Sequence, residues 1–324
     1  MAPQSVPQLH LITTLTAWKV DWVTLVIVVA SGVGYVLATR KLEQRGTPVE
    51  PSRRGAFLFG LVLWLLATMS FVGVYENVLF WVRALQVILL MMLIPFMLAF
   101  GVPLTVLREL LGESGRARFD RILHHRVARI LTAPATTSII IIATPWLLYY
   151  TQWYPTVLDN ATVDTLTKLA LVAVGFLYFY SRLQADPVPH KYPAMLSIAI
   201  TFTEVLVDAS LGLALWLGPL RAPEHYEAIA RTWGPDLQTD QIVGAGIIWI
   251  LGDLIGVPFL FALMRAMTKD EQASADKIDA ELDAQDQARA RAAAEAGIDE
   301  SQVPGPSRLW WEDDPELSER FKRG

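Results

Sequence analysis

The sequence has no cysteine, and charged residues are scarce for its length. Without cysteine, the 324-residue chain can form no disulfide, no thiolate metal site and no thiol redox centre. Charged residues make up 18% of the chain, whereas soluble proteins carry about 25%. This shortage excludes a disordered chain, a basic nucleic-acid-binding protein and an ordinary cytosolic enzyme. We therefore expect no nucleic-acid partner.

The motifs of common enzymes are missing as well. The chain has no HExxH zinc motif, no glycine-rich phosphate loop and no nucleophile with a base nearby. We therefore predict that the protein is not an enzyme.

Long apolar runs dominate the chain instead. Seven segments are long enough, or nearly so, to cross a bilayer, which takes about 20 residues. They lie at about 22–39, 55–74, 79–101, 130–151, 163–181, 194–218 and 240–264. Backbone polar groups in lipid must be satisfied within the segment, so each segment is expected to be a helix. The predicted fold is an all-α, polytopic membrane protein whose seven-transmembrane-helix bundle occupies residues 1–267.

Lysine and arginine are distributed unevenly between the loops. The loops on one side of the predicted bundle hold fifteen of these residues, and those on the other side, with the N-terminal stretch, hold three. Cytoplasmic loops carry the excess of positive charge, so we expect the N-terminus outside and the C-terminus in the cytoplasm. Tryptophan and tyrosine side chains cluster towards the outer ends, which agrees with this topology. The predicted location is the plasma membrane.

Two segments outside the predicted helices have a distinct composition. Residues 268–324 hold eight Lys and Arg against fifteen Asp and Glu, which predicts an acidic cytoplasmic tail, partly helical or disordered. Its Trp310 and Trp311 form either a short docking motif or an inert tail end. The basic loop 105–129 is either a helix lying on the anionic inner leaflet or a solvated loop that sets the topology.

Ionisable residues inside the predicted spans each cost about 2.5–3.5 kcal/mol on insertion scales, and five of them stand out. They are Arg83, Lys168, Glu204, Asp208 and Asp253. We expect the two cations to meet the three carboxylates in the outer half of the bundle. Three interpretations stay open: an ion-pair network that holds the helices, a metal, proton or substrate site, and side chains that face a water-filled vestibule.

Methionine and glycine provide two further signals in the spans. Met91 and Met92 carry thioethers, which suit Cu(I), but methionine also fills gaps in cores and neither has a histidine or cysteine beside it. The metal ligands are therefore unknown, with these two as candidates. Gly252 and Gly256 form a GxxxG pair, which predicts close contact between two helices.

Three stretches in sequence order resemble one known family. They are FWVRALQVILLMMLIPFMLAFGVPLTVLREL from residue 80, VGFLYFYSRLQADPVP from residue 174 and TDQIVGAGIIWILGD from residue 239. The matching residues are Phe80, Gln86, Leu89, Leu90, Gly101, Pro103, Leu104, Thr105, Gly175, Leu177, Phe179, Asp186, Pro187, Pro189, Asp240, Gln241, Gly244, Trp249 and Gly252. Over about residues 15–268 the chain resembles the CtaG-type cytochrome c oxidase assembly proteins of Gram-positive bacteria.

The resemblance implies a role in the maturation of haem–copper oxidases. Its implied partners are cytochrome c oxidase subunits or a copper donor protein, in the lipid bilayer, and its implied metal is copper. The family pattern places histidines where this chain has Arg83, Val87, Asp164 and Lys168. Arginine offers no lone pair to a metal, so charges stand here in place of the family's presumed copper ligands.

The function predicted from these observations is that of a membrane assembly factor for cytochrome c oxidase, acting by copper insertion or by scaffolding. A proton- or cation-coupled transporter that uses the intramembrane carboxylates is the alternative. The expected working surface is an outer vestibule lined by Arg83, Gln86, Lys168, Asp208, Asp240 and Gln241. In this hypothesis Asp208 also acts with Glu204 and Asp253 as a counter-charge.

Overall fold

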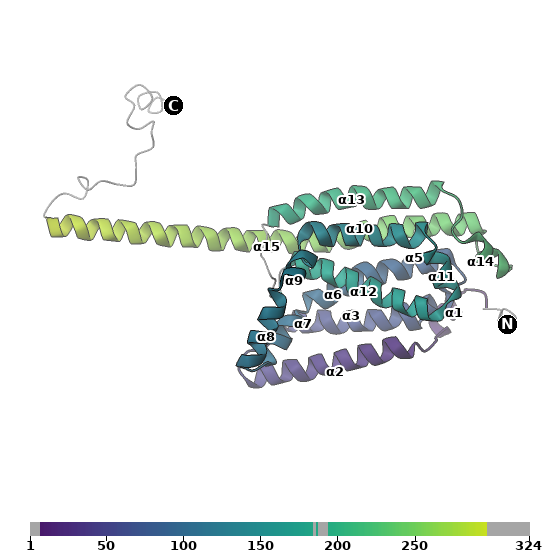
Figure 1. Cartoon of the computed structure of the whole chain (residues 1–324), viewed down its shortest axis with the longest axis horizontal. Coiled ribbons are helices and arrows are strands. Elements are labelled where there is room, and N and C mark those ends of the chain that lie inside the picture. The colour runs from purple at the N-terminus through teal and green to yellow at the C-terminus, as the bar shows by residue number, and fades with distance from the viewer. Residues whose placement is uncertain (1–6, 184–185, 187–193, 297–324) are drawn as a thin grey trace, which may run out of the picture. The chain divides into compact units, whose positions relative to one another are not determined.

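The computed structural model describes residues 7–183, 186 and 194–296, and the regular elements along these residues are helices (Figure 1). The chain divides into two compact units, Met1–Ala266 and Met267–Gly324. The first unit holds α1 to α14 and the start of α15. The helix α15, Leu237–Ala296, continues into the second unit, where its described side chains are exposed. Trp310 and Trp311 lie outside the described residues.

The seven predicted apolar segments all fall in helices. The elements are α1 Leu11–Thr16, α2 Trp22–Gln44, α3 Pro51–Met69, α4 Phe71–Tyr75, α5 Phe80–Ile88, the π-helix η1 Leu89–Leu93, α6 Ile94–Phe100, α7 Pro103–Leu110, α8 Glu113–Leu123, α9 Arg126–Leu131, α10 Pro134–Tyr150, α11 Trp153–Asp159, α12 Ala161–Leu183, α13 Ala194–Leu217, α14 Pro223–Ala228 and α15. The all-helical fold class is confirmed.

Among the described residues, five helices are long and apolar enough to cross a membrane. They are Trp22–Gln44, Pro51–Tyr75, Phe80–Phe100, Ala161–Leu183 and Leu237–Phe261. The other two predicted spans correspond to α10, with 17 residues, and α13, with 24 residues, some of whose side chains lie outside the described part. The count of seven spans and the orientation of the termini stay predictions.

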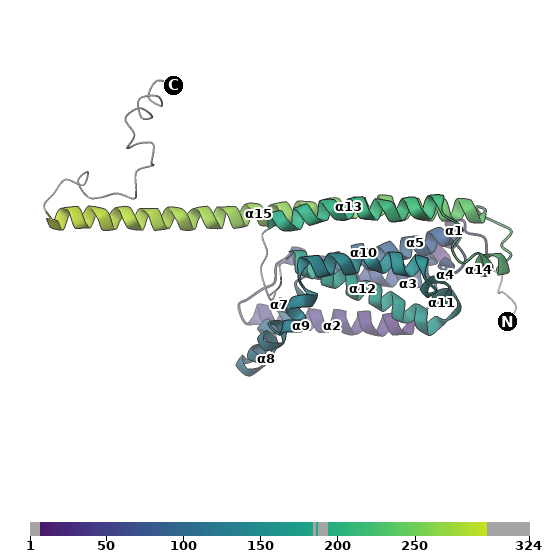
Figure 2. The same ribbon diagram turned by 45° about the horizontal axis from the view of Figure 1, so that its top comes forward.

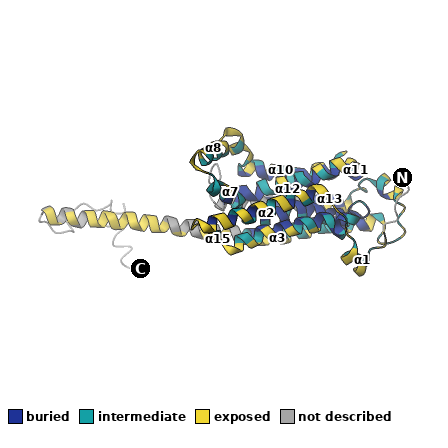
Figure 3. Cartoon of the chain, turned by 90° about the horizontal axis from the view of Figure 1, so that it is seen from below, coloured by how far each residue is buried: buried dark blue, intermediate teal, exposed yellow. Residues whose placement is uncertain are grey.

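The span formed by α5, η1 and α6 is the most enclosed of the five. In its apolar stretch 72% of the residues are buried, against 22% in α2. Helix α6 packs against α3 on one side and α12 on the other, and α12 packs against α10. Figure 2 shows α13 lying along α10, which it also contacts. Figure 3 shows exposed residues along α2, in keeping with its place at the edge of the bundle.

The basic stretch after α6 is helical in three short pieces, α7, α8 and α9. Arg108 of α7 pairs with Asp120 of α8 at 2.8 Å, and this pair connects the two pieces. Ile122, Val127 and Ile130 are exposed. Whether this segment lies on a membrane leaflet stays a prediction.

The π-helix η1 has a local cause in the sequence. Pro95 has no N–H, and its ring would clash in an α-helix with the carbonyl four residues earlier, that of Met91. The helix widens just before it, so that Ile94 donates its N–H to the carbonyl of Leu89, five residues back. On α12, Gly175 approaches this point so closely that a Cβ there would lie 2.6 Å from Pro95 Cγ and closer still to the Met91 carbonyl oxygen. A glycine is required for this contact.

The Gly252–Gly256 pair does not mark a close helix contact. No described neighbour lies within 4 Å of a Cβ built on either residue, so the prediction from the GxxxG spacing is wrong for this part of the chain. Gly244 on the same helix does permit close packing. A Cβ there would lie 2.7 Å from Phe80 Cε1 and 3.2 Å from Trp81 Cα.

We expect the substitution Gly175→Ala to lower the free energy of unfolding by about 1–3 kcal/mol, because the added methyl group overpacks α12 against η1. The matched control is Gly34→Ala on α2, where a Cβ meets nothing within 4 Å. That change should be neutral or stabilising by up to about 1 kcal/mol through helix propensity. Thermal unfolding of both variants in detergent would measure the difference, and equal stabilities would contradict the close contact.

Candidate functional site

Four charged side chains meet in the interior where α4, α5 and α12 approach one another. Glu76 follows α4, Arg83 lies on α5, and Asp164 and Lys168 lie one turn apart on α12. Their exposed fractions are 1%, 2%, 8% and 3%, so all four are buried. We call these four residues the Glu76 cluster.

The cations and carboxylates of the Glu76 cluster alternate. Lys168 Nζ lies 2.7 Å from Glu76 Oε1 and 2.6 Å from Asp164 Oδ2. Arg83 Nη2 lies 2.5 Å from Asp164 Oδ1, and Arg83 Nη1 lies 3.5 Å from Glu76 Oε2. Each charge therefore has two neighbours of opposite sign, and the four formal charges sum to zero. This balance matters because an uncompensated ion in the interior costs several kcal/mol.

Two further side chains complete the hydrogen bonding around Glu76. The Gln86 amide nitrogen donates to Glu76 Oε2 and, at 2.8 Å, to the carbonyl of Ala67 on α3, while its oxygen accepts from Arg83 at 2.9 Å. Lys19 lies between α1 and α2, and its Nζ is 2.6 Å from Glu76 Oε1. Its side chain is 37% exposed, so Lys19 connects the cluster to the surface.

The sequence identified the cations of this cluster but not their partners. Arg83 and Lys168 pair with Glu76 and Asp164, so the predicted meeting with Glu204 is wrong. Two signals pointed to the missed carboxylates. Glu76 is an acidic residue in a short loop without Lys or Arg between two apolar segments, and Asp164 precedes Lys168 by four residues, which places them on one helix face.

Glu204 belongs to a separate buried group at the other end of α12. Its Oε1 lies 2.8 Å from Arg182 Nη2, and its Oε2 accepts a hydrogen bond of 2.6 Å from the Tyr178 hydroxyl. Arg182 also donates to Ser138 of α10. This group connects α10, α12 and α13. Of the other two predicted counter-charges, Asp253 lines a hollow near Glu204, and the side chain of Asp208 lies outside the described residues.

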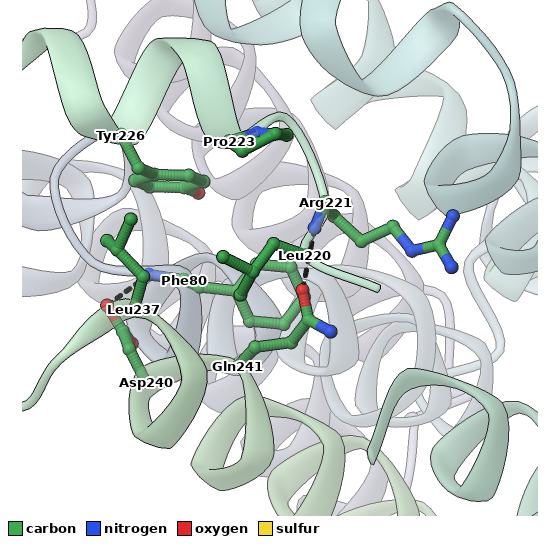
Figure 4. Close-up of a pocket in the computed structure, with 8 residues that line it drawn as sticks. All are labelled: Phe80, Leu220, Arg221, Pro223, Tyr226, Leu237, Asp240 and Gln241. Carbon is green, nitrogen blue, oxygen red and sulfur yellow. Dashed lines mark hydrogen bonds between the residues drawn. The ribbon is translucent and has the colours of Figure 1, made fainter. Parts of the chain in front are cut away.

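Asp240 and Gln241 are buried and hydrogen-bond to other segments of the chain. Asp240 accepts from the backbone N–H groups of Phe80, at 3.2 Å, and Trp81, at 2.9 Å, at the start of α5. Arg231 lies 3.2 Å from the same carboxylate. Gln241 accepts from the N–H of Arg221 at 2.7 Å. Figure 4 shows both residues among those that line a small hollow. The volume of this hollow is about 220 Å³, with the part open to the surroundings included.

Asp186 performs a similar task at the start of α7. Its carboxylate accepts from the N–H of Leu104 at 3.3 Å, and from the N–H and hydroxyl of Thr105 at 2.7 and 2.6 Å. These bonds satisfy N–H groups of the first turn that have no partner within the helix. Burial raises the pKa of the Asp186 carboxyl, although the hydrogen bonds act to lower it. Through Asp186, the second of the three sequence motifs therefore contacts the first. Through Asp240, the third motif also contacts the first.

Copper does not fit the Glu76 cluster. Arg83 has no lone pair to offer, and the Lys168 ammonium donates to two carboxylates. Within the described ranges, no three His, Cys, Asp or Glu residues are arranged to hold a metal ion. Met91 and Met92 line the hollows beside Gly252, so their thioethers are available in space, but whether they bind a metal stays a prediction.

The sequence of the chain is similar to one protein family and to several mycobacterial proteins. Residues 33–270 match the family described as cytochrome c oxidase caa3 assembly factor. An uncharacterised protein of Mycobacterium leprae is 23% identical over 282 residues, which are 85% of this chain and 43% of that protein. Uncharacterised proteins of Mycobacterium bovis and Mycobacterium tuberculosis are 26% identical over 287 residues, 83% of this chain and 43% of each relative. The chain thus spans less than half the length of these relatives. No solved structure matches.

We expect Glu76→Gln to lower the free energy of unfolding by about 3–5 kcal/mol, because it leaves an uncompensated positive charge in the interior. A matched control is Glu43→Gln, which removes an exposed ion pair with Arg54 and should change stability by less than about 0.5 kcal/mol. Unfolding in detergent would measure both.

A double variant tests whether restoring the charge balance restores the stability. Combining Glu76→Gln with Lys168→Met removes one charge of each sign and should recover most of the lost stability. A single variant as stable as its control, or a double variant no better than the single one, would show that charge balance does not hold this region together.

Proposed function

We propose that this chain, which belongs to the cytochrome c oxidase caa3 assembly factor family, assists oxidase assembly in the plasma membrane as a non-catalytic scaffold. In this proposal it binds oxidase subunits within the bilayer and holds them while the haem–copper centres are completed. Five helices suited to crossing a membrane support a multi-pass protein in this role.

The observation that carries the scaffold proposal is the closed set of contacts around Glu76. Arg83, Gln86 and Lys168 were candidates for a working surface, but each is buried and bonded to partners within the chain. Such groups cannot at the same time bind an acidic partner or pass a metal ion. We infer that the cluster fixes the shape of the bundle and that contacts with the oxidase are made at its outer faces.

Helix α2 offers such a face. Its exposed apolar side chains follow one another at spacings of three and four residues: Trp22, Val26, Val29, Val33 and Leu37. This spacing forms one continuous stripe along a helix. In a bilayer the stripe contacts either lipid or the helices of another protein, and we propose that oxidase helices bind here.

Copper insertion is the other form of this function, and the two thioethers beside Gly252 are the observation in its favour. A soft cation would find Met91 and Met92 in the hollow. The transporter alternative gains no support from the family match.

The test uses the organism that encodes the chain. We expect deletion of the gene to lower terminal oxidase activity in membranes, and added copper not to restore it, because a scaffold is missing rather than a metal. Complementation with the double variant Met91→Leu and Met92→Leu should restore activity as well as the native chain, because the change conserves volume and removes only the sulfur.

Restoration of the deletion strain by copper, or failure of the methionine double variant at normal protein levels, would overturn scaffolding in favour of copper insertion. Unchanged oxidase activity in the deletion strain would contradict the assembly function itself.

A further inference from the structure

The segment from α7 to α9 carries arginines that the chain itself does not neutralise. Two of its arginines are bound internally: Arg108 donates two hydrogen bonds of 2.8 Å to Asp120, and Arg116 Nη2 lies 2.9 Å from Glu109 Oε2. The others are exposed and make no ion pair within the described ranges: Arg118, Arg121, Arg126 and Arg129. Against these four positive charges, α8 and α9 hold one further acidic residue, Glu113.

Exposed apolar side chains lie among these arginines. On α9, Val127, Ile130 and Leu131 are 56%, 53% and 43% exposed, and their spacing of three and four residues from Val127 places them on one face. On α8, Ile122 is 66% exposed and lies one turn from Arg118. Apolar side chains gathered on a surface mark a contact with a membrane or with another protein.

The segment lies where the chain leaves the bundle and returns to it. It follows the apolar stretch Phe80–Phe100, which is long enough to cross a membrane, and it leads into α10 at Pro134. Helix α7 packs against α2 and α9 contacts α10, so both ends of the segment are fixed to the bundle. Figures 1 and 2 show α8 and α9 crossing this end of the bundle at an angle to the long helices. A segment that directly follows a span begins at the depth of the lipid head groups.

We propose that α8 and α9 form a surface that binds the phosphate groups of anionic phospholipids, in the leaflet at this end of the bundle. The apolar side chains contact the acyl chains, and the arginine stems extend so that the guanidinium groups reach the phosphate oxygens. The planar fork of N–H groups on arginine matches the geometry of phosphate. The bilayer supplies hydrocarbon and phosphate together at this depth, whereas an acidic protein segment supplies charge alone.

The first test measures the depth of this surface in the membrane. Because the chain has no cysteine, the variant Ile130→Cys takes a single nitroxide label, in the full chain in nanodiscs that contain phosphatidylglycerol. We expect oxygen to reach the label and a water-soluble nickel chelate not to reach it. The matched control is Ile278→Cys on α15, whose native side chain is 57% exposed among charged neighbours. Its label should be open to the nickel chelate.

The second test measures the preference for lipid charge. Phosphatidylglycerol and phosphatidylcholine, each with a diazirine at the same place in the acyl chain, are photolysed with the native chain, and mass spectrometry locates the label. We expect phosphatidylglycerol to label α8 and α9 about fivefold more than phosphatidylcholine, which is the contribution of one arginine near an anionic surface. At the exposed Val26 and Val29 of α2 the ratio should be close to one. Salt at 1 M should lower the ratio at α8 and α9, because the screening length falls to about 3 Å.

Two double variants separate the arginines of this surface from positive charge in general. Arg126→Gln with Arg129→Gln should bring the labelling ratio at α8 and α9 at least halfway to one. Lys277→Gln with Arg291→Gln removes the same charge from exposed positions of α15 and should leave the ratio unchanged.

Three results would overturn the proposal. The first is a label at position 130 that the nickel chelate reaches as readily as the label at position 278. The second is protection of position 130 in native membranes but not in nanodiscs, which would assign the surface to a protein partner. The third is equal labelling of α8 and α9 by the two lipids in the native chain, which decides the matter even if a variant fails to fold.

Discussion

Charge balance in the interior is the constraint on which the arrangement of α3, α4, α5 and α12 depends. Removing a charged side chain from water costs free energy, and this applies to Glu76, Arg83, Asp164 and Lys168. The attraction between their alternating charges offsets that cost. Because Gln86 then bonds both to the cluster and to the Ala67 carbonyl, α3 is brought to the same point. A shift of any one helix would break contacts to several others.

The remaining polar contacts of the bundle follow a related rule, in which a side chain from one segment satisfies the backbone of another. Asp240 binds the first N–H groups of α5, and Asp186 binds those of α7. Gly175 and Gly244 permit the close approach of α12 and α15 to the α5–η1–α6 span. The motifs that relate this chain to its family therefore include connections between helices. A fixed frame of this kind is what a scaffold for other membrane proteins requires.

The sequence was sufficient for features that depend on one segment at a time. Apolar length located the helices, and the rarity of Arg83 and Lys168 in apolar surroundings marked them as important. Pairing was harder, because it depends on which helix faces meet. Glu204 and Arg83 both lie within predicted spans, yet the bundle places Glu204 against Arg182, which lies just beyond the end of the predicted span 163–181. The Gly252–Gly256 spacing misled for the same reason, since spacing shows where a close contact is allowed but not whether a neighbour is there.

The most direct test of this account is a double-mutant cycle on Arg83 and Asp164, whose side chains lie 2.5 Å apart. Arg83→Met and Asp164→Leu would be made singly and together, and reversible unfolding in bicelles would give the three changes in free energy. The account predicts that the double variant is more stable than the sum of the single changes implies, with a coupling energy above about 1.5 kcal/mol. A coupling energy below about 0.5 kcal/mol would contradict it, because the two charges would then be independent of each other.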